Sequence, residues 1–366
     1  MRPETSIAVV GSGAAGIAAA VTAARAGWTT LLIDRRAAAG GTGGFSGLTT
    51  LCGLYDEQGG LLNDGFTREF VEALSDRAPV KMGKVWVLPY RQERFREVSS
   101  CFLAQMPNLQ ALWSVPLAHV VIESERIVSI NGFKIGAVID CSGCAEVAKA
   151  ISADCLETDE TTQAPAIVFP LRNVSRSLNT LPEVSQVLLP LARAGLPPVS
   201  FQPSLEPHTV TVKFTGRADQ AGQIIEFLRR HVSGFENCEI GSAGFVLAKR
   251  AGRMVIGEYV LTGADVLAGQ KFPDAVARCA WPIEQWSADG MARLRYLPAG
   301  AYYEIPARSL RAARVENLFM GGKTISADVD AIASARVMGC CLATGAAAAQ
   351  LAAQFLQSAR AHASLI

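Results

Sequence analysis

The most constraining feature of the sequence is a glycine-rich turn between two apolar stretches near the N-terminus. Residues 7–10 are apolar, residues 11–16 read Gly-Ser-Gly-Ala-Ala-Gly, and residues 17–26 are mostly alanine. A second apolar stretch, residues 29–33, ends at Asp34. A strand, a glycine turn, a helix and a second strand closed by an acid are typical of the βαβ unit that binds a dinucleotide. The sequence therefore predicts such a unit at its start.

Each residue type in this unit has a physical reason. Gly11 permits the tight turn, Gly13 lets the backbone approach a pyrophosphate, and Gly16 lets the helix pack on the strand. The helix N-terminus offers free N–H groups to the phosphates, and Asp34 can accept hydrogen bonds from a ribose. The cofactor contacts predicted from this unit are Gly11, Gly13, Ala14, Ala15, Gly16, Asp34 and Arg35.

The composition fits a compact globular protein and excludes two classes of partner. Of the 366 residues, 50% are hydrophobic and 18% are charged, which is enough apolar surface to bury a core in each of two lobes. The formal net charge is +1, so no overall field attracts nucleic acid or an anionic membrane. The alanine-rich stretch 335–353 carries Arg336 and Gln350. It is predicted as a buried helix and not as a membrane span.

The nine cysteines have no zinc-ligand spacing, and no metal site is predicted. Because the chain shows no leader segment, we expect a cytoplasmic protein whose cysteines are free thiols. Cys141 and Cys144 form a Cys-x-x-Cys pair, for which a structural role is favoured over a redox disulfide.

A second glycine-rich segment favours FAD over NAD. Residues 40–47 read Gly-Gly-Thr-Gly-Gly-Phe-Ser-Gly, residues 140–143 read Asp-Cys-Ser-Gly, and residues 315–322 end in Met-Gly-Gly. In this order, the segments resemble those of flavoproteins in the glutathione-reductase-like (two-dinucleotide-binding-domain) superfamily. The resemblance implies FAD, with its pyrimidine at the start of the alanine-rich helix. It implies further contacts from Gly41, Thr42, Ser46, Gly47, Val120, Ser142, Gly143, Gly322, Arg336, Val337 and Met338.

Longer stretches more narrowly resemble the FAD-dependent oxidoreductase family related to the fumarate reductase and succinate dehydrogenase flavoproteins. These stretches are residues 41–56, 250–261, 303–310 and 325–338. Two departures are visible. No histidine precedes His119, so we expect the FAD to be non-covalent, and Val329 stands near a place where the family often has histidine.

The resemblance implies an α/β fold: a Rossmann-like FAD-binding domain with a β-meander, and an α+β substrate-binding lobe inserted between its parts. The expected FAD-binding domain is 1–64, 111–156 and 299–366, and the expected substrate-binding lobe is 65–110 and 157–298. Meander strands are expected at 112–121, 127–130 and 137–140. Residue patterns predict a helix at 66–74, a strand at 210–214 and a helix at 220–231.

Four residues are candidates for catalysis. Arg250 and Arg253 match an Arg-x-x-Arg stretch of the family, and arginine suits capture of a carboxylate or general-acid work. Two structural roles explain the arginines equally well: they could lie on a solvent-exposed surface, or they could form an ion-pair cluster with Glu258. Tyr303 could donate a proton and Glu304 could accept one. Arg336 could stabilise the negative charge of reduced flavin, or cap the helix in solvent.

Three functions remain open at this stage. The first expectation is an FAD-dependent dehydrogenase or reductase acting on a small-molecule or peptide substrate. The alternative is an FAD-dependent monooxygenase, although Gly-Gly-Lys stands at 321–323, where aromatic hydroxylases carry Gly-Asp. The third is a catalytically inactive binding protein, against which the intact glycine motifs argue. With no second GxGxxG, electrons would come from the substrate, from a partner protein or from transiently bound NAD(P)H.

Overall fold

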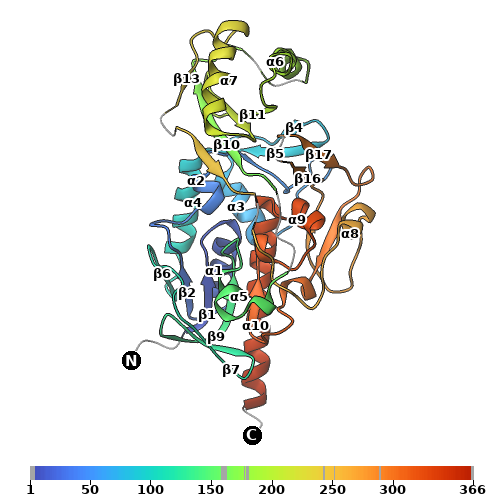
Figure 1. Ribbon diagram of the computed structural model, residues 1–366. Helices are drawn as coiled ribbons and strands as arrows, with labels where there is room; N and C mark the ends of the chain where they lie inside the picture. Colours follow the sequence, from blue (N-terminus) through green and yellow to red (C-terminus); the bar gives the residue numbers. More distant parts are fainter. Residues whose placement is uncertain are drawn as a thin grey trace.

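The protein contains two hydrophobic cores, each built around its own β-sheet (Figure 1). The computed structural model describes residues 5–157, 163–176, 178, 181–241, 244–250, 252–287 and 290–363. In Figure 1 the smaller sheet lies above the larger one, and the long C-terminal helix runs down through the lower part.

The larger core is organised by a parallel sheet. Its order is β6 (Leu109–Leu112), β2 (Thr30–Ile33), β1 (Thr5–Val10), β9 (Phe133–Asp140) and β19 (Leu318–Met320). The four residues of β2 and the last four of β9 are buried, because helices and loops cover both faces of a parallel sheet. The predicted βαβ unit is therefore confirmed.

The register of this sheet brings four loops to one edge. Val10 pairs with Ile33 and with Asp140, and Asp140 pairs with Met320. The strands are parallel, so the chain leaves all four at the same carboxyl edge. In open α/β sheets this edge is where ligands bind.

The β-meander forms, but with different boundaries from those expected. It consists of β7 (Val120–Glu123), β8 (Arg126–Ile130) and the first residues of β9. The expected strand 112–121 is wrong: Leu112 ends β6 in the parallel sheet, and β7 begins only at Val120. Between them, Asn131 accepts hydrogen bonds from the Ala118 and His119 amides through its side-chain oxygen and fixes the loop.

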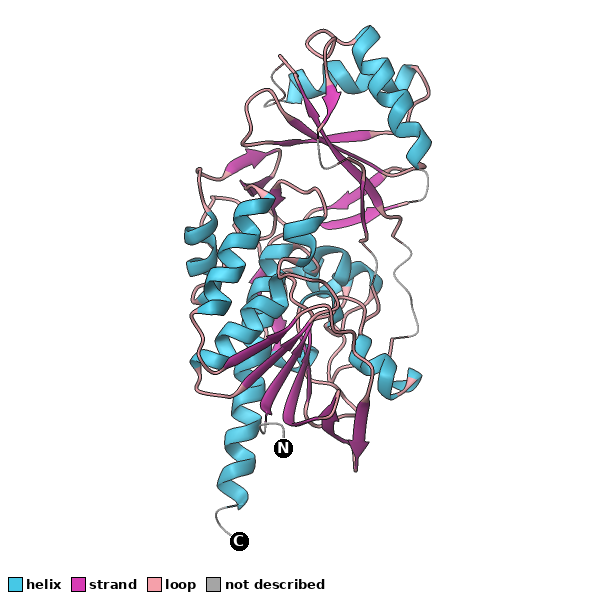
Figure 2. Ribbon diagram, turned by 90° about the vertical axis from the view of Figure 1, so that its left-hand side faces the viewer, coloured by secondary structure: helices cyan, strands magenta, loops and turns pink. Residues whose placement is uncertain are grey.

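Helices cover one side of the parallel sheet, as Figure 2 shows. They are α1 (Ala14–Arg25), α3 (Phe66–Leu74), α4 (Gln92–Ala104) and α10 (Met338–Ala363). A side chain on Gly345 of α10 would overlap the backbone of Ala15 in α1, so the two helices approach closely through small residues. α10 is long and apolar enough over Met338–His362 to cross a membrane, yet 72% of its apolar window is buried inside the protein.

Two details of the helical predictions are corrected. Helix α3 begins and ends where expected, but it and α4 pack into the larger core through Phe66, Phe70 and Phe95. Residues 65–110 therefore do not join the smaller lobe, apart from the hairpin of β4 (Val80–Met82) and β5 (Val85–Pro89) that lies next to it. The alanine-rich stretch 335–353 does form one helix, α10, but this helix begins at Met338, because the separate helix α9 (Val329–Ala335) ends before Arg336.

The smaller core lies under an antiparallel sheet that we call the cap sheet. It consists of β10 (Ala166–Arg172), β11 (Val199–Pro203), β12 (Val210–Phe214), β13 (Glu239–Ile240) and β14 (Val246–Ala248). Helices α6 (Leu181–Arg193) and α7 (Ala218–His231) cover one face, burying Val212 and Phe214. The strand 210–214 and the helix over 220–231 are confirmed. Residues 254–283 instead contribute to the larger core, so the smaller core is narrower than the expected 157–298.

The other face of the cap sheet looks toward the larger core. Side chains alternate along β12, so Thr211 and Lys213 point away from α6 and α7. Val168 of β10 contacts the loop at Gly47, where an added Cβ would lie 3.0 Å from the valine side chain. The second glycine-rich segment therefore lies directly beneath the cap sheet.

Short elements connect these layers. They are α2 (Gly41–Phe45), β3 (Thr50–Leu51), α5 (Glu146–Ile151), α8 (Gly263–Ala268), β15 (Ala275–Cys279), β16 (Ile283–Trp286), β17 (Ala292–Arg295) and β18 (Tyr303–Pro306). β15 pairs with β18 and β16 pairs with β17, both antiparallel.

The cysteines are not all free thiols, which corrects the expectation from the sequence. Cys279 at the end of β15 and Cys340 in the first turn of α10 form a disulfide, and both are fully buried. The other seven cysteines are free. The bond joins two segments 61 residues apart, a separation from which no pairing could be predicted.

Thiol counting tests this bond. Unfolded without reductant, the protein should show seven reactive thiols, and after reduction nine. Replacing Cys279 and Cys340 together by alanine should lower the free energy of unfolding by about 2–4 kcal/mol, because the crosslink restricts the unfolded chain. Replacement of the exposed Cys101 is the control, and nine thiols before reduction would contradict the pairing.

Candidate functional site

The first glycine turn and the second glycine-rich segment touch each other. A Cβ on Gly11 would lie 2.5 Å from the Cys141 carbonyl oxygen, and one on Gly41 would lie 2.6 Å from Gly13 Cα. Gly11 and Gly41 also have φ of 96° and 48°, which glycine adopts without strain. The Gly40 amide donates to the Ser12 carbonyl over 2.9 Å. Two segments about thirty residues apart thus form one backbone wall.

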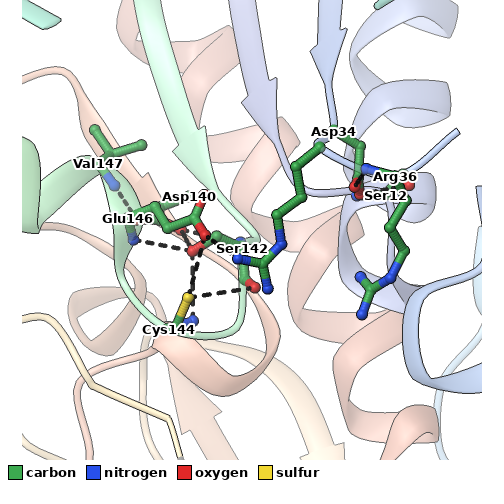
Figure 3. A network of polar contacts seen from close by, with 9 residues as sticks. Ser12, Asp34, Arg36, Asp140, Ser142, Cys144, Glu146 and Val147 are labelled. Carbon is green, nitrogen blue, oxygen red and sulfur yellow. Dashed lines mark hydrogen bonds and ion pairs between the residues drawn. The ribbon is translucent and has the colours of Figure 1, made fainter. Parts of the chain in front are cut away.

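Asp34 closes the second strand and organises the turn around it. The Ser12 amide and hydroxyl donate to Asp34 Oδ2 over 2.6 and 2.7 Å, and the Arg36 amide donates to Oδ1 over 2.7 Å. In Figure 3 Asp34 lies with Ser12 and Arg36 on one side of the view, and the group around Asp140 lies on the other. Because its oxygens are fixed by neighbouring donors, the carboxylate is held in place beside a cleft.

This cleft lies at the carboxyl edge, between the loops after β1, β2 and β9. Its lining residues are Val10, Gly11, Ile33, Asp34, Arg35, Arg36, Val115, Leu117, Ser142 and Glu146. Arg35 forms an ion pair with Glu146 over 3.3 Å. Val115 and Leu117 line the cleft, whereas Val120, for which a cofactor contact is expected, lies at the start of β7 and is not among the lining residues. The sequence offered no signal for these two, because the loop 113–119 has no periodic pattern.

The turn after β9 is built around a buried carboxyl. Asp140 accepts hydrogen bonds from the Ser142 amide (3.0 Å), the Ser142 hydroxyl (2.6 Å) and the Val147 amide (3.0 Å). Burial raises the pKa of Asp140, against these hydrogen bonds. Cys141 and Cys144 are both free thiols, and Cys144 lies 3.5 Å from Glu146 Oε1. The pair is not a disulfide, and burial raises the pKa of each thiol.

Lys323 brings a cation to the same edge from the loop after β19. Its side chain passes over Gly143, where an added Cβ would lie 2.9 Å from Lys323 Cε and 3.5 Å from Nζ. The preceding Gly322 amide donates to Thr344 Oγ1 over 3.0 Å. Burial lowers the pKa of Lys323, and the charges of Arg336 and Arg36 lower it further. The sequence alone marks Lys323 only as part of the Gly-Gly-Lys that stands where aromatic hydroxylases carry Gly-Asp, and it gives no sign that this lysine reaches the site.

The far end of the site lies where α10 begins. The Gly339 amide donates to the Cys52 carbonyl over 2.8 Å, which joins the start of α10 to the segment after the second glycine-rich loop. The Ser46 hydroxyl donates to the Thr42 carbonyl over 2.5 Å and closes α2. Gly47, Arg336, Val337 and Met338 therefore lie on segments that meet beneath the cap sheet. Thr42 is exposed, whereas Ser46 is buried.

A group of buried charges, which we call the charge cluster, occupies this end. It consists of Lys213 from the cap sheet, Arg250 after it, Glu284 from β16, and Arg336 between α9 and α10. Lys213 and Glu284 are 16% and 15% exposed, and their charged atoms are 3.9 Å apart. Arg250 is 8% exposed and lies over the Trp286 ring at 4.2 Å.

Glu284 is the only carboxylate of the cluster, and its charge is fixed. The indole N–H groups of Trp286 and Trp281 donate to its two oxygens over 2.6 and 3.1 Å. Burial alone would raise the pKa of Glu284, but the Lys213 and Arg336 cations and the two indoles lower it to about 2. Burial lowers the pKa of Arg250 to about 10, and burial with Glu284 nearby raises the pKa of Cys52 to about 12. Cys52 is therefore a neutral thiol at pH 7.

Comparison with known proteins places the chain. The model of the FAD dependent oxidoreductase family matches residues 6–209 and 195–365. The chain belongs to this family. No match is found among curated proteins.

Solved structures show the same fold. One is a geranylgeranyl bacteriochlorophyll reductase-like protein from Thermoplasma acidophilum, with 13% identity, a TM-score of 0.52, and coverage of 97% of this chain and 79% of that one. Another is the flavin-dependent brominase Bmp2, with 12% identity, a TM-score of 0.50, and coverage of 97% and 80%. At these identities the similarity concerns the fold alone.

The residues of this FAD-dependent oxidoreductase fit its cofactor. The backbone wall of Gly11, Gly13 and Gly41 has no side chain that would block a pyrophosphate, since a Cβ on Gly13 would meet only Gly41 Cα at 3.9 Å. The Asp34 cleft suits the adenosine end, and the start of α10 suits the flavin end. Among the residues that the structure describes, no group of His, Cys, Asp and Glu is arranged to hold a metal.

The four predicted catalytic residues do not meet in one place. Arg250 lies in the charge cluster. Arg253 is half-buried and directly follows Gly252, where an added Cβ would overlap the Gly143 carbonyl oxygen. Its segment therefore passes the turn after β9, at the other end of the site. Glu304 accepts the Phe272 amide over 3.0 Å and lies 3.8 Å from Arg278. These partners tie Glu304 to the β15–β18 hairpin and not to the charge cluster, which weighs against its role as a base.

Tyr303 is a core residue. It is fully buried, and its hydroxyl lies 2.9 Å from Ser334 Oγ. Because Ser334 donates its own proton to the Trp281 carbonyl over 2.5 Å, Tyr303 must be the donor to Ser334. Burial raises the pKa of Tyr303, so its expected role as proton donor to substrate is not supported.

Replacement of Lys323 tests the pyrophosphate end. Lys323→Met should raise the dissociation constant for FAD about tenfold to a hundredfold, because a charge-assisted contact to phosphate is lost. Quenching of flavin fluorescence on titration of the FAD-free protein measures this constant. Lys134→Met, at an exposed position of β9, is the matched control, and equal FAD affinity in both variants would contradict the expectation.

Replacement of Tyr303 tests its structural role. Tyr303→Phe should lower the free energy of unfolding by about 1 kcal/mol, because one buried hydrogen bond is lost, and should leave FAD content and flavin reduction unchanged. Denaturant unfolding and anaerobic reduction kinetics measure the two effects. A large loss in the rate of flavin reduction, with the free energy of unfolding unchanged, would instead indicate a catalytic role for Tyr303.

Proposed function

We propose that this FAD-dependent oxidoreductase is a dehydrogenase or reductase, acting on a small molecule or a peptide side chain bound beneath the cap sheet. The observation that carries the proposal is the position of Arg336. It lies at the start of α10, where the flavin ring is expected, and its guanidinium also donates to Gln163 Oε1 and to the Glu284 carbonyl over 3.0 and 3.2 Å. The cofactor end and the charge cluster are thus parts of one site.

The chain's own residues bind, orient and shield, while the bound cofactor supplies the hydride chemistry. Arg336 offers positive charge where a reduced ring becomes negative, and the first turn of α10 adds its dipole. Lys213 and Arg250 face this region from the cap side. The cap sheet and the rings of Trp281 and Trp286 exclude water, which strengthens each of these interactions.

The closer relationship to the glutathione-reductase-like superfamily, and to fumarate reductase flavoproteins, is part of the proposal. The order of the segments supports it: the βαβ unit, the second glycine-rich segment, the meander, and β19 followed by α10. The same relationship supports the cap sheet as the substrate-binding lobe and Arg253 as a further residue of the site.

A monooxygenase is the second candidate. The fold shared with the flavin-dependent brominase Bmp2 supports it, as does the water-excluded position of the charge cluster. The residues that the structure describes form a single dinucleotide-binding unit. If the protein is a monooxygenase, its electrons would therefore come from transiently bound NAD(P)H, which has no separate binding domain in this chain, or from a partner protein.

Flavin spectroscopy distinguishes these functions. The purified protein should release FAD on denaturation, with absorption maxima at about 370 and 450 nm. Under anaerobic conditions, a dehydrogenase fed by its substrate should not bleach with NADH alone. Bleaching by NADH, followed by peroxide or a hydroxylated product on aeration, would favour the monooxygenase. A colourless protein that cannot be reconstituted with FAD would contradict both candidates.

A further inference from the structure

The charge cluster has an excess of positive charge. Lys213, Arg250 and Arg336 are cations, and Glu284 is the single carboxylate bonded among them. Within the part of the chain that the structure describes, two positive charges of the cluster therefore remain without a counter-charge in a buried place. A buried charge is costly unless an opposite charge joins it, so the cluster is arranged to receive an anion.

Three hydrogen-bond donors in the cluster, or on the neighbouring Gln163, have no partner among the described residues. They are Arg250 Nη2, Arg336 Nε and Gln163 Nε2, all buried. A fourth donor is only weakly engaged, because Lys213 Nζ lies 3.9 Å from Glu284 Oε1, beyond hydrogen-bond distance. Each unpaired buried donor costs about 1–3 kcal/mol, a cost that a bound acceptor would remove.

The donors are tied to one another by a short backbone segment. Arg250 Nη1 donates to the Ala164 carbonyl over 2.6 Å and lies 2.9 Å from Thr215 Oγ1, while Arg336 Nη2 donates to the neighbouring Gln163 over 3.0 Å. Lys213 lies 4.9 Å from the centre of the same Trp286 ring that Arg250 covers. The four donors therefore surround one region beside Trp286.

Glu284 does not occupy this region. Both of its oxygens are held by indole N–H groups, and its low pKa keeps it ionised at any pH at which the protein is used. It acts as a fixed counter-ion that keeps the cations in place. The free donors are left for a ligand.

We propose that Lys213, Arg250, Arg336 and Gln163 bind the carboxylate of the substrate, next to the flavin ring. The proposal rests on the proposed function and names its substrate class. Four donors match a carboxylate, whose two oxygens accept about four hydrogen bonds. The two indoles beside the donors suit an aromatic or otherwise flat body for the acid.

Benzoate is the probe, since it combines a carboxylate with a ring. Titrated into the FAD-loaded protein, it should perturb the flavin absorption spectrum saturably, whereas benzamide, its uncharged analogue, should not. Lys213→Met and Arg250→Met should each raise the benzoate dissociation constant at least about tenfold, because a charged donor is lost.

Lys249→Met is the matched control, since this lysine is exposed and adjacent to Arg250 in the chain. It should bind benzoate as the unaltered protein does. Flavin content and circular dichroism identify a variant that has lost its fold. If a variant has lost its fold, the carboxylate site is still tested with the unaltered protein. Acetate should compete with benzoate for binding, and acetamide should not.

The outcomes separate this inference from the proposed function. A protein without flavin contradicts the proposed function before benzoate is added. If flavin is present and reducible but benzoate has no effect, or benzamide binds equally well, the carboxylate site is wrong and the oxidoreductase stands. Equal competition by chloride would show a general anion site and would also overturn the inference.

Discussion

The contact between two glycine-rich loops is the constraint on which the rest of the site depends. Gly41 packs on Gly13, Gly16 packs on Gly11, and Gly11 packs on Cys141. Each contact leaves no room for a Cβ atom, so the backbone of three loops forms one continuous wall at the carboxyl edge of the sheet. The equal register of β1, β9 and β19 sets these loops level with one another. A slip of any of these strands would separate the two ends of the site.

Charge is distributed unevenly along this wall. At the adenosine end, Glu146 forms an ion pair with Arg35, and Asp34 accepts the Arg36 backbone amide. In the middle, Lys323 passes over Gly143 and feels the charges of Arg36 and Arg336, which suits a pyrophosphate. At the ring end, the charge cluster holds more cations than Glu284 can neutralise. The protein therefore places positive charge where a cofactor and a substrate would each bring negative charge, although its overall charge is only +1.

The start of α10 connects these features to the stability of the larger core. The disulfide from Cys340 to Cys279 and the hydrogen bond from the Gly339 amide to Cys52 both act on its first turn. The helix is then largely buried as far as Ala353, and it packs on α1 through small residues. Arg336 is therefore held at the end of a rigid element, which limits how far its guanidinium can move relative to Glu284. This rigidity suits a residue that must serve the ring and the substrate at once.

The sequence by itself determined the βαβ unit, its acid, the second glycine-rich segment and the FAD family, because these depend on local spacing of glycine and apolar residues. It also placed α3 and β12 correctly. Only the tertiary structure decided that α3 and α4 belong to the larger core, that Cys279 pairs with Cys340, and that Tyr303 is a core residue. Lys213, Glu284 and Gln163 join Arg250 and Arg336 from segments up to 173 residues apart. No local pattern encodes such a meeting, because it arises from the packing of the cap sheet over the parallel sheet.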